Sequence, residues 1–270
     1  MLGALEDTPG SSADDPHHRD VRAAFYKDGD VWKALPSDCT GEPCLKKLAS
    51  DFLRETTWTI AFDGKKLGEV QSRIPLSLDV NSHVGQQQIL TDAKKVPSIG
   101  MRSHEFEGWA AVAVLRPLVA VSAAYFKDPD IWKPALIDAE TATLVRREFR
   151  KKHPKITDCE SEEQHEYPDS DVHLLKAYAA KTGWRLVLAS LEGCDAEDMR
   201  GDGLNHEWFT IDPQKAAHYL ASNLVLVDAG DYDNSGHSQL LFMVDDYNRG
   251  GYTLFYDDFQ KQATFDYRFH

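Results

Sequence analysis

The C-terminal part of the chain alternates short apolar runs with short turns, and this pattern limits the possible folds. Runs rich in β-branched and aromatic residues span 224–227, 239–244, 252–256 and 263–269. The turns between them contain Asp, Asn and Gly, which favour tight reversals of the chain. The pattern predicts a four-stranded antiparallel meander over residues 224–269, the form of one propeller blade or of half a sandwich.

An internal repeat adds a second constraint, because the segment 21–33 returns with mostly similar residues as the segment 121–133. Each copy runs from an aromatic pair through Lys-Asp-x-Asp to a Trp, so we expect two equivalent structural units. One interpretation of each copy is a strand end, a tight turn and a packed Trp. The other is a ligand surface, whose residues are Asp28, Asp30, Trp32, Asp128, Asp130 and Trp132.

Local signals elsewhere predict mainly hairpins. Two hairpins with Gly-containing turns are expected within 58–70 and 173–191. Short amphipathic helices are expected at 44–54 and 140–151, the second one capped by Asp138. The predicted class is therefore all-β with few short helices. The expected architecture is a β-propeller-like array of four-stranded antiparallel meanders, with a pair of β-sandwiches as the alternative.

The domain organisation is expected to be simple. Residues 1–20 are rich in Gly, Ser, Pro, Asp and His, which predicts a flexible lead-in before a single β-rich domain over 21–270. The lead-in lacks a basic region followed by an apolar core, so it does not have the pattern of an intact signal peptide. No stretch reaches the ~20 apolar residues of a membrane helix, so membrane insertion is not expected.

The charge balance narrows the range of partners. The chain has 30 Lys and Arg against 44 Asp and Glu, a formal net charge of −14. Such a charge repels phosphate backbones at long range, which argues against nucleic acid as a partner. A cationic ligand or a metal ion is favoured instead, and the expected macromolecular partner is an unknown protein or a carbohydrate.

The four cysteines are even in number and lie in polar, turn-like surroundings. Two disulfides are one interpretation, and four reduced thiols in a cytosolic protein are the other. Together with the acidic segment described next, which suits millimolar extracellular calcium, the first interpretation predicts a periplasmic or secreted protein. The residues concerned are Cys39, Cys44, Cys159 and Cys194.

An acidic segment at 231–239 places oxygen-bearing groups at every second position, with Gly236 at the sixth. Calcium takes six to eight oxygen ligands, and this spacing lets one loop wrap around the ion. The sequence therefore predicts a weak, structural calcium site. An empty turn and a catalytic metal site are the alternatives. The expected ligands are the side chains of Asp231, Asp233, Ser235 and Gln239, with the main chain of His237.

Residues 224–244 resemble the calcium-binding FG-GAP and VCBS repeats of integrin-like β-propellers. The likeness consists of Asp231, Asp233 and Gly236, with an apolar strand on each side of the loop. The repeat pattern has carboxylates where this chain has Ser235 and Gln239. Each difference replaces a charged oxygen by a neutral one, so the resemblance implies a weaker calcium site than is usual for the family.

No motif for catalysis stands out. The sequence contains no Gly-x-Ser-x-Gly elbow, no His-Glu-x-x-His helix and no Gly-rich phosphate loop. The pairs at 104–105 and 206–207 join His to Glu, but neighbouring strand residues point to opposite faces. Whether the chain is an enzyme stays open. The expected function is non-catalytic recognition outside the cytoplasm, and the alternative is an extracytoplasmic hydrolase of carbohydrate or peptide that uses clustered aspartates.

Overall fold

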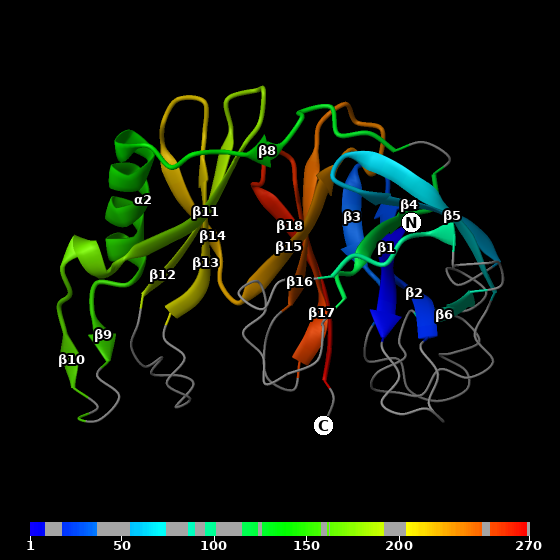
Figure 1. Ribbon diagram of the computed structural model, residues 1–270, viewed down its shortest axis with the longest axis horizontal. Coiled ribbons are helices and arrows are strands. Elements are labelled where there is room, and N and C mark those ends of the chain that lie inside the picture. The colour runs from blue at the N-terminus through cyan, green and yellow to red at the C-terminus, as the bar shows by residue number, and fades with distance from the viewer. Residues whose placement is uncertain are drawn as a thin grey trace. The chain divides into compact units, whose positions relative to one another are not determined.

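Most of the described chain lies in β-strands that form several antiparallel sheets (Figure 1). The predicted all-β class is confirmed at this level, whereas the propeller-like array stays a prediction. One α-helix occurs among the described residues. The computed structural model describes residues 1–8, 18–36, 55–73, 86–89, 95–100, 115–123, 126–157, 161, 163–191, 204–244 and 249–268.

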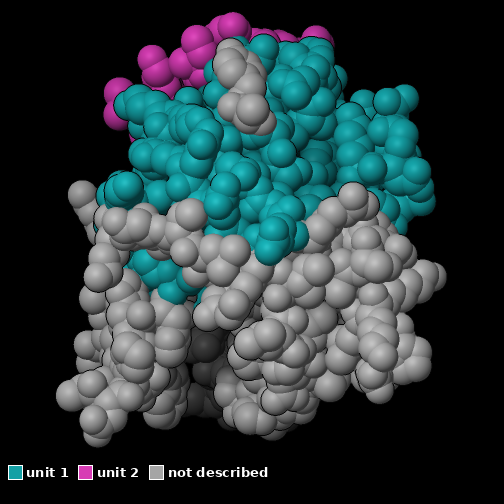
Figure 2. Space-filling view, turned by 90° about the vertical axis from the view of Figure 1, so that its right-hand side faces the viewer, with its two compact units in different colours: residues 1–129, 225–270 teal, residues 130–224 magenta. Residues whose placement is uncertain are grey.

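The chain divides into two compact units (Figure 2). Each unit has its own hydrophobic core. Unit 1 comprises residues 1–129 and 225–270, and unit 2 comprises residues 130–224. The single β-rich domain expected over 21–270 stays a prediction.

Unit 1 contains a seven-stranded sheet in the order β1-β7-β4-β5-β6-β2-β3, with an additional pairing of β1 with β2. The hairpin expected within 58–70 is confirmed, because β4 and β5 pair on either side of Asp63 and Gly64. Both turn residues have positive φ, 52° and 68°, as the two-residue Asp-Gly turn requires. The strands are β1 (Leu2–Thr8), β2 (His18–Asp28), β3 (Val31–Ala34), β4 (Thr56–Phe62), β5 (Lys65–Arg73), β6 (Gln86–Ile89) and β7 (Leu118–Val121).

Residues 2–8 form strand β1, which differs from the flexible lead-in expected over 1–20; of that lead-in the structure describes 1–8 and 18–20. The strand pairs with β2 on one side and β7 on the other, and Leu2 and Leu5 are fully buried. The close approach of β1 to β2 requires Gly3, since a Cβ there would lie 2.0 Å from the carbonyl oxygen of Arg22. Local composition does not predict this strand, because the strand is stabilised by pairing with segments that are distant in the sequence.

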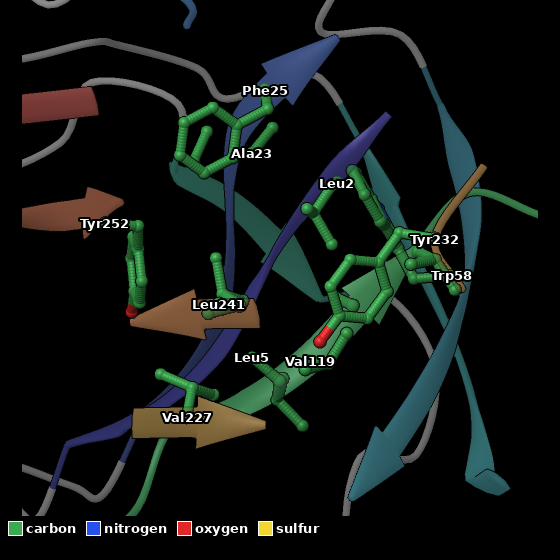
Figure 3. Close-up of a cluster of buried hydrophobic side chains, with 14 of the residues drawn as sticks. Leu2, Leu5, Ala23, Phe25, Trp58, Val119, Val227, Tyr232, Leu241 and Tyr252 are labelled. Carbon is green, nitrogen blue, oxygen red and sulfur yellow. The ribbon is translucent and has the colours of Figure 1, made fainter. Parts of the chain in front are cut away.

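A second sheet of unit 1 has four strands in the order β15-β16-β17-β18, within the segment where the meander is expected. Its side chains Val227, Leu241 and Tyr252 share one core with Phe25 and Trp58 of the seven-stranded sheet (Figure 3). Unit 1 is therefore two sheets on a common core. The strands are β15 (Leu224–Gly230), β16 (Gln239–Val244), β17 (Arg249–Tyr256) and β18 (Lys261–Arg268).

Unit 2 combines a five-stranded sheet, in the order β14-β13-β12-β11-β8, with helix α2 (Figure 1). The helix Ala139–Lys152 confirms the one expected at 140–151, and the Asp138 carboxylate caps it by accepting a 2.7 Å hydrogen bond from the Thr141 N–H. The hairpin expected within 173–191 is also confirmed. The other elements are β8 (Lys133–Pro134), β9 (Ile156–Thr157), β10 (Gln164–His165), η3 (Asp169–Asp171), β11 (His173–Ala179), β12 (Arg185–Leu191), β13 (Leu204–Ile211) and β14 (Ala217–Ala221).

The two copies of the repeat have different backbone structures, so the expected equivalence is wrong. In the first copy β2 and β3 form a hairpin, and Gly29 takes a φ of 61° in its turn. Pro129 occupies the corresponding place in the second copy, and its ring restricts φ to about −65°. The second copy therefore cannot make the same turn. It has its positive φ at Ile131 instead, an unusual conformation for a β-branched residue.

Several expectations fall outside the described residues. These are the helix at 44–54, the pair at 104–105 and the disulfides of Cys39, Cys44, Cys159 and Cys194. Within the described part of the chain, no helix has the length and apolar character that crossing a membrane requires.

Candidate functional site

The loop 231–239, here called the acidic loop, connects β15 to β16 and packs against the segment 126–128 of the same unit. The backbone N–H of Asp231 donates to the carbonyl of Lys127 at 2.8 Å. The hydroxyl of Ser238 donates to the carboxylate of Asp128 at 2.6 Å. These contacts bring the predicted calcium ligands next to the aspartate of the second repeat copy.

Asp231 organises the first half of the acidic loop through backbone groups. Its side chain is buried, and its two oxygens accept hydrogen bonds of 2.9 Å from the N–H groups of Ser235 and Gly236. The chain reverses through Asn234 and Gly236, which both have positive φ. Asn and Gly adopt this conformation more readily than other residues, which explains why the sequence folds into a turn here.

Gln239 organises the second half of the loop from its centre. Its Nε2 lies 3.1 Å from Asp233 Oδ1, 3.1 Å from Ser235 Oγ and 2.9 Å from the carbonyl oxygen of His237. Its Oε1 accepts a 2.7 Å hydrogen bond from the backbone N–H of Tyr232. One side-chain amide therefore joins both ends of the loop.

In their observed positions, the oxygen ligands of the acidic loop do not fit a calcium ion. Calcium needs six to eight oxygens at about 2.3–2.6 Å, whereas the point where three loop oxygens converge holds the Gln239 nitrogen. Both oxygens of Asp231 already accept N–H groups. Among the described residues, no group of three or more His, Cys, Asp or Glu is arranged to hold a metal. The calcium site at the acidic loop stays a prediction of the sequence.

A buried carboxylate, Asp228, lies at the end of β15 just before the acidic loop. Its side chain accepts hydrogen bonds from the N–H groups of Ala229 and Gly64, but its Oδ2 is buried and has no hydrogen-bond partner among the described residues. Burial raises the pKa of Asp228 to about 7; the Ala229 N–H opposes this shift, and the carboxylates of Asp128 and Asp63 add to it.

Gly64 brings the neighbouring acids together. Its N–H contacts the Asp228 carboxylate, and a Cβ on Gly64 would lie 3.2 Å from the Cβ of Asp128. Asp63 precedes it in the β4–β5 turn. We call Asp63, Asp128 and Asp228 the carboxylate cluster. The β4–β5 turn, the end of β15 and the segment 126–128 thus bring acids from distant parts of the sequence close to one glycine.

No protein-family model, curated protein or solved structure matches this chain. The resemblance of residues 224–244 to FG-GAP and VCBS repeats therefore stays a prediction.

The ligand surface expected from the first repeat copy is largely architectural. Trp32 is 3% exposed and belongs to the core of unit 1. Asp28 and Asp30 are exposed at the β2–β3 turn, and Asp28 pairs with Lys33 at 2.5 Å. This copy offers two solvated aspartates but no exposed Trp.

The second copy is divided between the two units. Asp128 belongs to unit 1, whereas Asp130 and Trp132 belong to unit 2. Asp130 is buried, and its carbonyl accepts a 2.8 Å hydrogen bond from the N–H of Lys181. A single ligand surface formed by both copies stays a prediction.

Unit 2 contains a buried carboxylate contact that the sequence analysis missed. Glu207 on β13 is 2% exposed, and its Oε2 lies 3.1 Å from Nε2 of His153, the residue after α2. The hydroxyl of Tyr219 also contacts Glu207, and the pKa of Tyr219 is raised by burial and by this carboxylate. His153 and Glu207 are 54 residues apart, so no local signal points to their contact.

Proposed function

We propose that the chain is a non-catalytic binding module that takes a divalent, oxygen-preferring cation such as calcium beside two members of the carboxylate cluster, Asp228 and Asp128, with water as further ligands. The observation that supports this proposal is Asp228 Oδ2, a buried oxygen without a partner among the described residues. A buried charged group is costly unless it is paired, so this oxygen favours either a proton or a cation beside it.

Asp228 and Asp128 are the residues that would hold the cation, together with the hydroxyl of Ser238, which donates to Asp128. Carboxylate and hydroxyl oxygens suit calcium and magnesium, and both ions keep waters when protein ligands are few. A cation there would tie the β4–β5 turn to the end of β15 and the segment 126–128. The role is structural, because it would order the loops beside the exposed aspartates of this unit.

The compartment, the partner and the propeller-like array also belong to this proposal. A recognition module with a weak cation site suits a periplasmic or secreted protein, where calcium is millimolar, and its partner would be a protein or a carbohydrate. A propeller-like array rests on the single sheet β15–β18 and on the resemblance of residues 224–244.

Thermal melting in millimolar calcium chloride and in EDTA tests the proposal. A ligand at a hundred times its Kd stabilises a protein by about 2.7 kcal/mol, which raises Tm by roughly 5–10 °C for a chain of this size. We expect such a shift in the wild type and its loss in Asp228→Asn. Asp258→Asn, a change at an exposed aspartate of the same unit, is the control and should keep the shift. Equal wild-type melting in calcium and EDTA would reject the cation.

A second candidate is the extracytoplasmic hydrolase, because a carboxyl group with a pKa near 7 beside another acid is typical of general acid catalysis. Asp228 is only 9% exposed, however, and a catalytic acid must come within hydrogen-bond reach of its substrate. Turnover of chromogenic glycosides or casein that Asp228→Asn abolishes would favour this second candidate.

A further inference from the structure

The amide of Gln239 occupies the point in the acidic loop toward which the predicted calcium ligands converge. Asp233, Ser235 and His237 each present an oxygen to its Nε2, at 2.9 to 3.1 Å. These are hydrogen-bond distances, longer than the about 2.3–2.6 Å of calcium–oxygen contacts. We infer that the Gln239 amide replaces a cation here, so that the acidic loop keeps its shape without a metal ion.

The orientation of this amide follows from a neighbouring backbone group. The N–H of Tyr232 can only donate, and it donates to Gln239 Oε1 at 2.7 Å. The NH2 group must therefore face the three loop oxygens. Because the Gln239 side chain is 97% buried, reversing the amide would leave one buried donor facing another.

The remaining carboxylate oxygens of the loop also have protein partners. Both oxygens of Asp231 accept backbone N–H groups. The Oδ2 of Asp233 lies 2.6 Å from the ammonium of Lys27 on β2. The positive and partially positive groups that a cation would supply are thus provided by the chain itself. This inference is separate from the cation proposed at the carboxylate cluster.

The first test uses the Asp228→Asn protein, in which the carboxylate cluster is weakened, so that the acidic loop is read alone. We expect its melting temperature to be equal in EDTA and in millimolar calcium, and calorimetric titration with calcium chloride to show no binding heat. A lower melting temperature in EDTA that disappears when Asp233→Asn is added would overturn the inference, because it would place a metal within the loop. A lower melting temperature that Asp233→Asn leaves unchanged would instead place the metal outside the loop.

The second test replaces the amide by a carboxylate, using Gln239→Asp and, separately, Gln239→Glu in the same Asp228→Asn background. Each change removes the central donor and adds a negative charge among oxygens, so each variant should melt lower than its parent in EDTA. Calcium should recover several degrees and give a binding heat that the parent lacks. Gln262→Asp, on the exposed part of β18, is the matched control and should show no calcium dependence.

The outcomes separate the two proposals. If neither Gln239 variant shows calcium dependence, the role assigned to the amide is overturned. This holds whether or not the variants fold in EDTA. The cation at the carboxylate cluster is judged only by the wild type against Asp228→Asn. Either proposal can therefore fail while the other holds.

Discussion

Each unit of the protein buries a carboxylate, and the two carboxylates have opposite environments. In unit 2, Glu207 is held by His153 and Tyr219. In unit 1, Asp228 accepts two backbone N–H groups but leaves Oδ2 without a partner among the described residues, close to two other acids. Both are more than nine-tenths buried, so burial alone does not distinguish them.

The two environments have opposite consequences for stability. A buried acid whose partners come from the same unit forms a closed arrangement, and removing a partner lowers stability. A buried acid with a partnerless oxygen has a raised pKa, and a ligand that neutralises it can add stability. Unit 2 therefore shows a structural contact, whereas unit 1 shows a buried carboxylate oxygen that has no hydrogen-bond partner among the described residues.

The largest expected effect is the pH dependence of unit 1, measured by urea unfolding in EDTA. The folded pKa of Asp228 is about 7, above the unfolded value of 3.8, so the folded state binds more protons between these values. Stability should therefore fall as pH rises from about 4 to 7, by at most about 4 kcal/mol. Asp228→Asn should remove this fall and be more stable than the wild type at pH 8.

The comparison between the units would break if the pH profile of Asp228→Asn matched that of the wild type. The exposed Asp258→Asn serves as the control here as well and should leave the profile unchanged.

The next effect is expected in unit 2. His153→Ala removes a partner of a carboxylate that is 2% exposed, and a buried charged acceptor that loses a hydrogen bond costs about 3 kcal/mol. Urea unfolding at pH 7 measures this loss. His218→Ala provides the matched control, because His218 pairs with Asp212 at the surface and should contribute less than about 1 kcal/mol. Equal losses in the two variants would show that Glu207 does not depend on His153.

The smallest effect concerns a carboxylate that is half exposed. Asp138 caps α2, and the Thr141 backbone and side chain, with Arg185 nearby, hold its pKa below the usual value. In urea unfolding at pH 7, Asp138→Ala should lower the free energy of unfolding, whereas Asp138→Asn, which can also cap, should lower it much less. Equal costs for the two variants would indicate that charge, rather than the cap hydrogen bond, is the stabilising factor.

Features that depend on a few neighbouring residues could be predicted from the sequence. The β4–β5 hairpin follows from Asp63 and Gly64, and α2 follows from apolar spacing with Asp138 as its cap. The turn of the acidic loop also follows from local residues, because Asp231 bonds to N–H groups four and five residues ahead.

Features that depend on distant contacts could not be predicted in this way. Strand β1 is recognised only through its pairing with β2 and β7. The two repeat copies are similar in sequence, but Pro129 excludes the turn that Gly29 makes in the first copy. The environment of Asp228 could not be predicted because it involves residues at least a hundred positions away, such as Asp128 and Gly64.

Gly64 has a consequence for anyone who redesigns this protein. A methyl group at this position would press on the side chain of Asp128 at 3.2 Å, and the φ of 68° already disfavours any other residue. The lack of one carbon atom at Gly64 thus leaves room for Asp128 beside the backbone N–H that contacts Asp228. Loop grafts or consensus substitutions in the β4–β5 turn should leave this position untouched, even where the surrounding hairpin tolerates exchange.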